Sequence, residues 1–402
     1  MARARAAWAH LQLLGEPANN TREALLRAGW LHAIGGADGY VSLWSRVRDF
    51  KRADVEDPLR EGRLWIAPGV RGCTMLVPRE ELGLALLVGT RDARRRTERE
   101  LAKAKVETSE VEALCDAVRA ALAEAPKSTS DLRGALPAGA VRSLGEVGRK
   151  IGLSSTLPVA LRLLEADGVI GRRAADGELD NERWIWSLHE SSPLAAWSPE
   201  PTQVAMELAS RYFRQAAPAT VRGFATWSGL GLRECQAAVQ TLGLAPVAVE
   251  GGAELGYAPE SLLPLLADPP AAPSVAFVAF RDNHLDMRLG VTALVAPASW
   301  GRQAPSWGSG RTTLQAVKHL HGRGLLGEGA LVGMWDYDAE RGVLLRGAFG
   351  ALPRATRRDL AGRCLALEHF LRDQVGHCLI YRMEPQRSRE QRLAAIRALE
   401  SC

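Results

Sequence analysis

Two short segments about eighty positions apart begin alike, and each is followed by an amphipathic helical pattern. The first is VRSLGEVGRKIG (141–152), and the second is VRGFATWSGL (221–230). Apolar residues spaced three and four apart predict packed helices after both segments. The apolar faces consist of Leu157, Ala160, Leu161 and Leu164 after the first segment, and of Cys235, Ala238, Val239 and Leu242 after the second. Helical patterns also precede them, at 131–136 and 203–216, so the chain contains an internal repeat.

Strand patterns follow each repeated set of helices. VIGRRA (169–174) and RWIWSL (183–188) lie on either side of an Asp176-Gly177 turn and predict a hairpin. Residues 246–251 and 254–259 predict a shorter one. Three helices and a hairpin form the winged-helix pattern, in which the third helix enters a DNA groove and the hairpin contacts the DNA backbone. The same unit can also serve for protein contact.

The N-terminal part of the chain resembles a third, more diverged unit. Asn20 and Glu23 predict the capped start of a helix, and a short helix is expected at 54–62. Alternating residues predict strands at 63–68 and 72–78, and one or two long helices are expected over 80–124. The run at 91–105 is strongly basic, which fits either a solvated helix surface or a surface that follows phosphates.

The C-terminal third begins after a Pro-rich linker at 268–274. Short apolar runs predict strands, and two helices are expected after them. The strands are expected at 277–280, 291–297, 330–338 and 343–349, and the helices at 355–375 and 387–400. The predicted fold class is α+β, with three tandem winged-helix units followed by a small C-terminal β domain, a partial barrel with closing helices. The expected domains are 1–125, 126–198, 199–267 and 275–402.

Composition and charge narrow the class of protein. Of the 402 residues, 47% are hydrophobic and 24% are charged, which is typical of a globular protein. No apolar run approaches the roughly 18–20 residues that a membrane helix needs. Six scattered cysteines without a Cys-x-x-Cys pair favour reduced thiols, so we expect a cytoplasmic, nucleoid-associated protein without a structural metal or cofactor. The net charge of +5 favours nucleic acid only weakly.

Five segments, in this order along the chain, resemble the AlkZ/YcaQ-type winged-helix DNA glycosylases. They are VRGCTMLVP (70–78), STLPVALRLLEADGVIGRR (155–173), RYFRQAAPATVRGFATWSGL (211–230), FRDNHLDMR (280–288) and LVGMWDYD (331–338). The resemblance implies a monofunctional DNA glycosylase of base excision repair that acts on double-stranded DNA. We expect a monomer, because three winged helices in one chain reduce the need to dimerise on DNA. The enzyme's substrates would be N7-alkylated purines, bulky or crosslinked adducts among them. Such a base is a good leaving group, so the enzyme needs mainly a water held against C1′ and a suitable electrostatic environment.

The family positions this water with a Gln-x-Gln or Gln-x-Asp motif, which matches His32-Ala33-Ile34 in this chain. His32 can hold or activate a water, whereas Ile34 cannot hydrogen-bond to one. Asp38 is the candidate for a second catalytic group, with a turn residue as its alternative. Met75 stands where the family has a histidine. These departures leave a non-catalytic DNA-binding protein, for damage recognition or transcription regulation, as the alternative function.

Six residues are candidates for DNA contact, most of them with a structural alternative. Arg46 belongs to the stretch that follows the motif, and Arg71 follows a predicted strand. The others are Arg172 and Arg173 on the predicted wing and Asn283 and His284 in the polar stretch of the C-terminal domain. Neighbouring strand residues face opposite ways, so we expect only one of the two wing arginines to face DNA. His319 and His321 lack a nearby third ligand, so no metal site is predicted.

Overall fold

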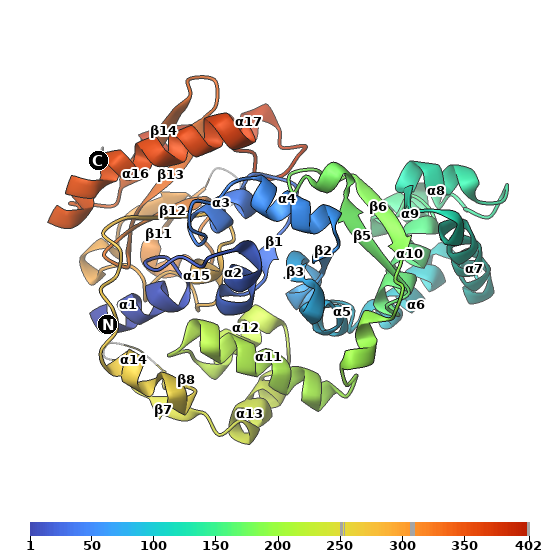
Figure 1. The fold of residues 1–402 in the computed structure, drawn as a ribbon, viewed down its shortest axis with the longest axis horizontal. Coiled ribbons are helices and arrows are strands. Elements are labelled where there is room, and N and C mark those ends of the chain that lie inside the picture. The colour runs from blue at the N-terminus through green and yellow to red at the C-terminus, as the bar shows by residue number, and fades with distance from the viewer. Residues whose placement is uncertain (250–251, 253, 306–309, 400–402) are drawn as a thin grey trace. The chain divides into compact units, whose positions relative to one another are not determined.

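The computed structural model describes residues 1–249, 252, 254–305 and 310–399. Contacts divide the chain into two compact units, one formed by 1–55 together with 205–402 and the other by 56–204 (Figure 1). The first unit is therefore discontinuous in sequence. The division falls at residue 55, inside the segment 1–125 that the pattern predicts as one domain.

The unit of residues 56–204 is built on a sheet with strand order β3-β2-β5-β6-β4. The strands predicted at 63–68 and 72–78 appear as β2 (Leu64–Pro68) and β3 (Thr74–Pro78), which pair with each other, and the predicted hairpin appears as β5 (Ile170–Ala174) with β6 (Trp184–Leu188). Ile66 of β2 pairs with Arg172 of β5, which joins the two hairpins. The remaining elements are α4 (Ala53–Arg60), α5 (Leu82–Gly89), α6 (Ala93–Ala104), α7 (Thr108–Glu124), β4 (Lys127–Ser128), α8 (Thr129–Ala135), α9 (Gly145–Ile151) and α10 (Leu157–Ala166).

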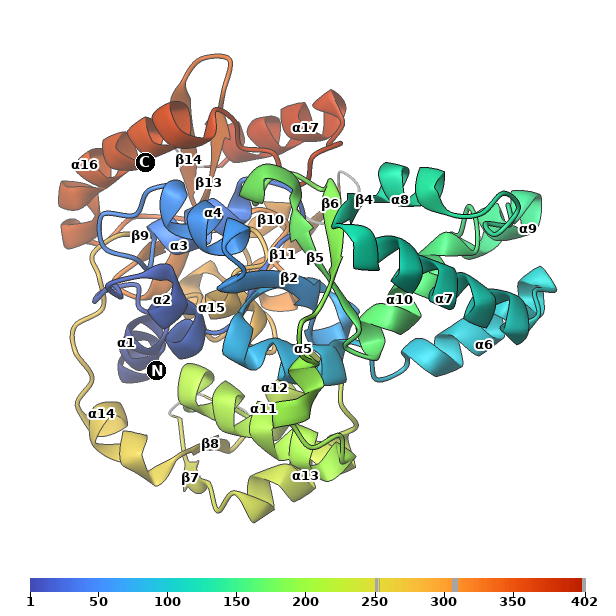
Figure 2. The same ribbon diagram turned by 45° about the vertical axis from the view of Figure 1, so that its right-hand side comes forward.

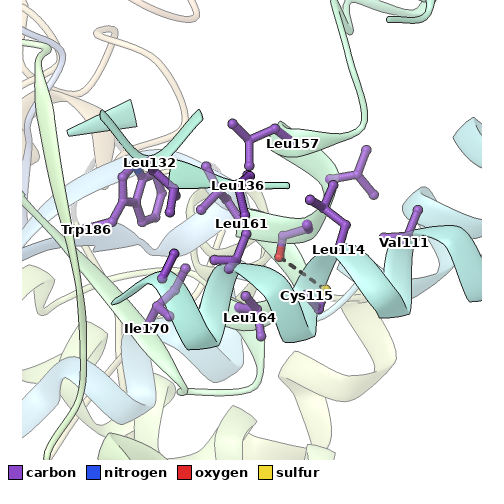
Figure 3. Close-up of a cluster of buried hydrophobic side chains, with 14 of the residues drawn as sticks. Val111, Leu114, Cys115, Leu132, Leu136, Leu157, Leu161, Leu164, Ile170 and Trp186 are labelled. Carbon is purple, nitrogen blue, oxygen red and sulfur yellow. Dashed lines mark hydrogen bonds between the residues drawn. The ribbon is translucent and has the colours of Figure 1, made fainter. Parts of the chain in front are cut away.

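The core of this unit lies between its helices and the β5–β6 hairpin (Figure 3). Leu157, Leu161 and Leu164, which the helical pattern placed on one face, are all buried there. Leu114 of α7 and Trp186 of β6 belong to the same cluster. The apolar face predicted for 154–168 is therefore confirmed, because helix periodicity alone determines which side chains can leave water together.

The other unit contains a four-stranded antiparallel sheet with order β14-β13-β12-β9. Helices α16 and α17 pack on β14, and α17 also packs on β13 (Figure 2). These elements are β9 (Ala276–Val278), β12 (Arg323–Gly327), β13 (Ala330–Asp338), β14 (Val343–Ala348), α16 (Arg354–Phe370) and α17 (Gln386–Arg397). Its other elements are α1 (Ala2–Leu11), α2 (Thr21–Ala28), β1 (Leu31–His32), α3 (Asp38–Trp44), α12 (Val221–Ser228), α13 (Leu232–Thr241), β7 (Ala245–Val247), β8 (Gly256–Ala258), α14 (Leu263–Ala267), α15 (Asn283–Asp286), β10 (Gln303–Pro305) and β11 (Arg311–Thr313), with α11 (Pro201–Ala216) beginning in the neighbouring unit.

Two expectations about secondary structure are corrected. Residues 291–297 form turns rather than a strand, with the Leu294 and Val295 amides both donating to the Val291 carbonyl. Their apolar character reflects burial in the core, which a short apolar run does not distinguish from a strand. The region 80–124 forms three helices, and Lys105, in the left-handed conformation, ends the second. Glu250 and Gly251 of the predicted second hairpin and Glu400 of the predicted last helix lie outside the described residues.

The chain thus has a mixed α+β fold, as expected. The arrangement as three tandem winged-helix units stays a prediction. Among the described residues, no helix is both long and apolar enough to span a bilayer.

Candidate catalytic site

His32 is carried by a short segment whose path depends on glycine. Helix α2 begins at an Asn20 cap and ends at Gly29, which has a φ of 98°. After β1 the chain passes Gly36, where a Cβ atom would lie 2.2 Å from the Ile380 carbonyl oxygen. Only glycine permits so close an approach. The next amide, Ala37, donates to the Leu379 carbonyl at 2.8 Å, so the segment after His32 is held against residues 379–380.

A buried carboxylate lies at the centre of a group of cationic and ionisable side chains. The Asp286 side chain is 5% exposed, and its Oδ2 is 3.8 Å from His32 Nε2 and 3.0 Å from Arg281 Nε. Its Oδ1 is 3.8 Å from His319 Nδ1. The two histidine distances are ion-pair rather than hydrogen-bond distances. The His32 side chain is 8% exposed and that of His319 is 40% exposed, so only one imidazole faces solvent substantially.

Helix α15, which carries Asp286, is fixed to the segment around His32. The Asp282 carboxylate caps the helix through the His284 amide and accepts from Arg46 at 2.6 and 2.9 Å. Burial acts to raise the pKa of Asp282, but the Arg46 guanidinium outweighs it and the pKa is lowered. The side-chain amide of Asn283 donates through Nδ2 to the carbonyls of Ala28 and Trp30, at 3.1 and 2.9 Å. The chain immediately before His32 is therefore tied to α15.

Asp38 and Arg323 connect the His32 segment to the segment that carries His319. Arg323 donates to both Asp38 carboxylate oxygens, at 2.7 and 2.8 Å, and to Asp336 at 2.6 Å. The Phe280 amide also donates to Asp38, at 2.8 Å. Burial disfavours the charged guanidinium, yet the nearby carboxylates, Asp38 foremost, raise the pKa of Arg323. Both oxygens of Asp38 are thus engaged in holding α3 to β12.

His284 is fully buried on the first turn of α15. Burial, and then the charge of Arg288, lower its pKa to about 3, so its imidazole is neutral at physiological pH. Arg46 is also 0% exposed. The four predicted residues Asp38, Arg46, Asn283 and His284 therefore form the buried frame around the site, where their burial leaves no surface for DNA. His32 is the one predicted residue that lies beside Asp286.

The predicted wing arginines lie in the unit of residues 56–204. Arg172 is 3.3 Å from the buried Glu165 carboxylate, with its guanidinium 5.3 Å from the centre of the Trp184 ring. Arg173 donates to the Arg60 carbonyl at 2.9 Å and lies over Trp65. Both arginines are therefore held against tryptophan rings. Arg71, half-buried with a φ of 57°, lies in the turn between β2 and β3.

A cavity of about 780 Å³ has Ile34 on its wall, and its lining is mainly apolar but includes the charged residues Asp336, Glu384 and Arg392. Ile34, Phe280 and His321, each within two residues of His32, Arg281 or His319, line it together with Met334 and Trp335. Burial, and then the charges of His319 and Arg281, lower the pKa of His321. The second position of the motif thus borders a mainly apolar space, which suits a hydrophobic group rather than a bound water.

Sequence reasoning missed three members of the site: Arg281, Asp286 and His319. The stretch 280–288 was recognised as polar, and an Asp four residues after Asp282 on one helical face was the signal available. For His319 and His321 the sequence favours an exposed basic loop over a metal site, and neither interpretation gives His319 a carboxylate partner. Among the described residues, no group of three or more His, Cys, Asp or Glu could hold a metal ion.

Comparisons with known proteins cover most of the chain. A family model described as "DNA glycosylase AlkZ-like" matches residues 25–370, a range that includes the whole site. The solved structure of Streptomyces sahachiroi DNA glycosylase AlkZ is similar, with a TM-score of 0.66 and 18% sequence identity. That similarity covers 94% of this chain and 98% of the other. No curated protein sequence gives a significant match.

Proposed function

Because this chain belongs to the AlkZ-like family of DNA glycosylases, we propose that it hydrolyses the N-glycosidic bond of N7-alkylated purines in double-stranded DNA. The observation that carries the proposal is the position of His32, the residue at the family's water-holding motif, beside the buried Asp286 carboxylate. A buried carboxylate favours the protonated form of a neighbouring imidazole, which makes the neutral imidazole a better base.

In this reaction the protein has to position one water molecule and accept one proton from it. The cationic base leaves C1′ with the bonding electrons and becomes a neutral 7-alkylpurine. Water oxygen bonds to C1′, and the proton it loses passes to His32. Because Nε2 is the ring nitrogen beside Asp286, we assign Nδ1 as the ring nitrogen that accepts this proton. The imidazolium then lies beside a carboxylate, and the abasic sugar is left neutral at C1′.

The cavity gives the alkyl substituent of the damaged base a place to lie. Its volume of about 780 Å³ falls within the range of small-molecule sites. Ile34 replaces the second polar residue of the motif on its wall, so water is held by His32 alone and the neighbouring position contacts the adduct. Bulky N7 adducts are therefore the substrates that this site would favour over methylated bases.

Helix α6 supplies a surface for the DNA backbone. Arg95, Arg99 and Lys103 are exposed and recur every four residues, which places them on one face about 6 Å apart along the axis. Arg94, by contrast, is neutralised by Asp167 at 2.5 Å. A regular row of cations on one face matches the repeated charge of a phosphate backbone.

Single-turnover base release tests the proposed activity, using duplexes that carry N7-methylguanine or a bulkier N7 adduct and reading alkali-labile abasic sites. We expect His32→Ala to slow release by about a hundredfold or more, the typical contribution of a positioned base. His32→Gln can hold water, as the glutamine of the family motif does, but cannot take its proton, so we expect it to release base more slowly than the wild type and faster than His32→Ala. His10→Gln is the control, since His10 lies on α1 and pairs with Glu16.

Three results would change the proposal. Release that survives His32→Ala removes His32 from the reaction. Full activity of His32→Gln reduces its role to holding the water. Absence of release from every substrate, with duplex binding intact, favours the non-catalytic DNA-binding function instead.

A further inference from the structure

Asp286 presents each of its carboxylate oxygens to a different imidazole at the same distance. Oδ2 lies 3.8 Å from His32 Nε2, and Oδ1 lies 3.8 Å from His319 Nδ1. We infer that Asp286 positions His32 and that His319 competes with His32 for the same negative charge, thereby setting the pH at which His32 acts as a base. This inference rests on the proposed function for its catalytic consequence, but the coupling between the histidines does not.

The three side chains are held by separate buried contacts, so their spacing is a property of the fold. Asn283 ties α15, and with it Asp286, to the carbonyls of Ala28 and Trp30 just before His32. Arg323, four residues after His319, is bound by Asp38, six residues after His32. The two imidazoles therefore reach one carboxylate from segments that are far apart in sequence but joined on both sides of the site.

The charges around Asp286 make double protonation unfavourable. Arg281, whose Nε is 3.0 Å from Oδ2, is a permanent cation on the oxygen that faces His32. His32 from β1 and His319 from the segment before β12 also lie beside the carboxylate, and His321 lies close to His319 and Arg281. One buried negative charge already balances Arg281. A proton on His319 then opposes a second on His32.

The two histidines differ in access to solvent, which gives them different roles. The His319 side chain is 40% exposed and exchanges protons with water, whereas the His32 side chain is 8% exposed. His319 is thus a positioning residue that acts through Asp286, and it need not touch the substrate. Protonation of His319 lowers the proton affinity of His32 and keeps it in the neutral form that the proposed reaction requires.

Titration of ¹⁵N-labelled histidines by NMR, in the full-length protein without DNA, tests the coupling directly. We expect His319→Gln to raise the pKa of His32 by about one unit and Asp286→Asn to lower it by about one unit, since Asp286 is a negative charge and His319, when protonated, a positive one. His10→Gln is the control, because His10 Nδ1 also lies 3.9 Å from a carboxylate, that of Glu16, but in a more solvent-exposed pair. It should leave the titration of His32 unchanged.

The pH dependence of single-turnover base release tests the catalytic consequence. The rising acid limb should move to higher pH in His319→Gln and to lower pH in Asp286→Asn, and a merely structural role would not produce opposite shifts. A His32 titration unchanged by His319→Gln overturns the inference, and this variant should fold because His319 lies at the surface. If the two histidines titrate in a coupled way but the wild-type protein releases no base, the inference stands and the proposed glycosylase activity is rejected.

Discussion

Replacement of Asp38 by Asn should destabilise the unit that contains the site far more than it impairs chemistry. The Asp38 carboxylate accepts two hydrogen bonds from Arg323 and one from the Phe280 amide. An asparagine keeps one carbonyl oxygen for these donors, but its NH₂ group would face an Arg323 N–H. The substitution therefore removes one charge-assisted hydrogen bond and leaves the buried guanidinium with less negative charge.

The magnitude follows from these contacts. A hydrogen bond to a charged group contributes about 1.5–3 kcal/mol, and breaking a buried ion pair costs about 3–5 kcal/mol. Arg323 keeps Asp336 as a partner, 2.6 Å from Nη1, so the loss of stability should lie near the lower end of the 3–5 kcal/mol range. We expect the free energy of unfolding to fall by about 3 kcal/mol. For a domain of this size that corresponds to a decrease of about 6–12 °C in Tm.

Thermal and urea unfolding, followed by circular dichroism, measure this loss, and base release is assayed well below the lowered Tm. Arg323→Met is the companion variant, and it should lose more stability because it strips the guanidinium from Asp38 and Asp336 together. An Asp38→Asn protein that melts with the wild type but no longer releases base would refute the structural role. It would restore Asp38 as a catalytic group.

Four further predictions concern the buried His284, the close approach at Gly36, the cationic face of α6 and the cavity. His284 has its pKa lowered to about 3 in the folded state, so its contribution to stability is fully present above the unfolded pKa near 6.5 and is lost as the pH falls towards 3. The free energy of unfolding should therefore drop by about 2 kcal/mol between pH 6.5 and 5. His284→Gln should abolish this dependence on pH. Gly36→Ala should cost about 1–3 kcal/mol and slow base release because its Cβ meets the Ile380 carbonyl, whereas Gly231→Ala, with open space around its Cβ, should do neither in the same melts and assays. The double variant Arg95→Gln, Arg99→Gln should lower the dependence of duplex affinity on log salt by about two, measured by fluorescence anisotropy, while Arg94→Gln changes it less; equal slopes in all three proteins would exclude α6 from the DNA interface. Ala395→Phe should fill part of the cavity and raise KM for a bulky N7 adduct while leaving N7-methylguanine release unchanged, and a parallel loss on both substrates would argue against the cavity as the adduct site.

Most helices and hairpins of this chain can be predicted from its sequence. The apolar faces of α10 and α13, the hairpins β2–β3 and β5–β6 and the C-terminal helices follow from periodicity and turn residues, which act over a few neighbouring positions. The segment 291–297 shows the limit of this reasoning, because its two valines and one leucine are equally apolar in a buried turn and in a strand.

The site depends on contacts that local patterns do not encode. His32 could be singled out from the order of segments along the chain, but its partner Asp286 lies 254 positions away and His319 lies further still. The pairs that frame the site span comparable distances, with 236 positions between Arg46 and Asp282 and 285 between Asp38 and Arg323. In a single sequence, an arginine destined for a buried carboxylate looks the same as one destined for a phosphate. Only the tertiary fold, by removing water from these groups, decides which charges must pair inside and which remain outside for DNA.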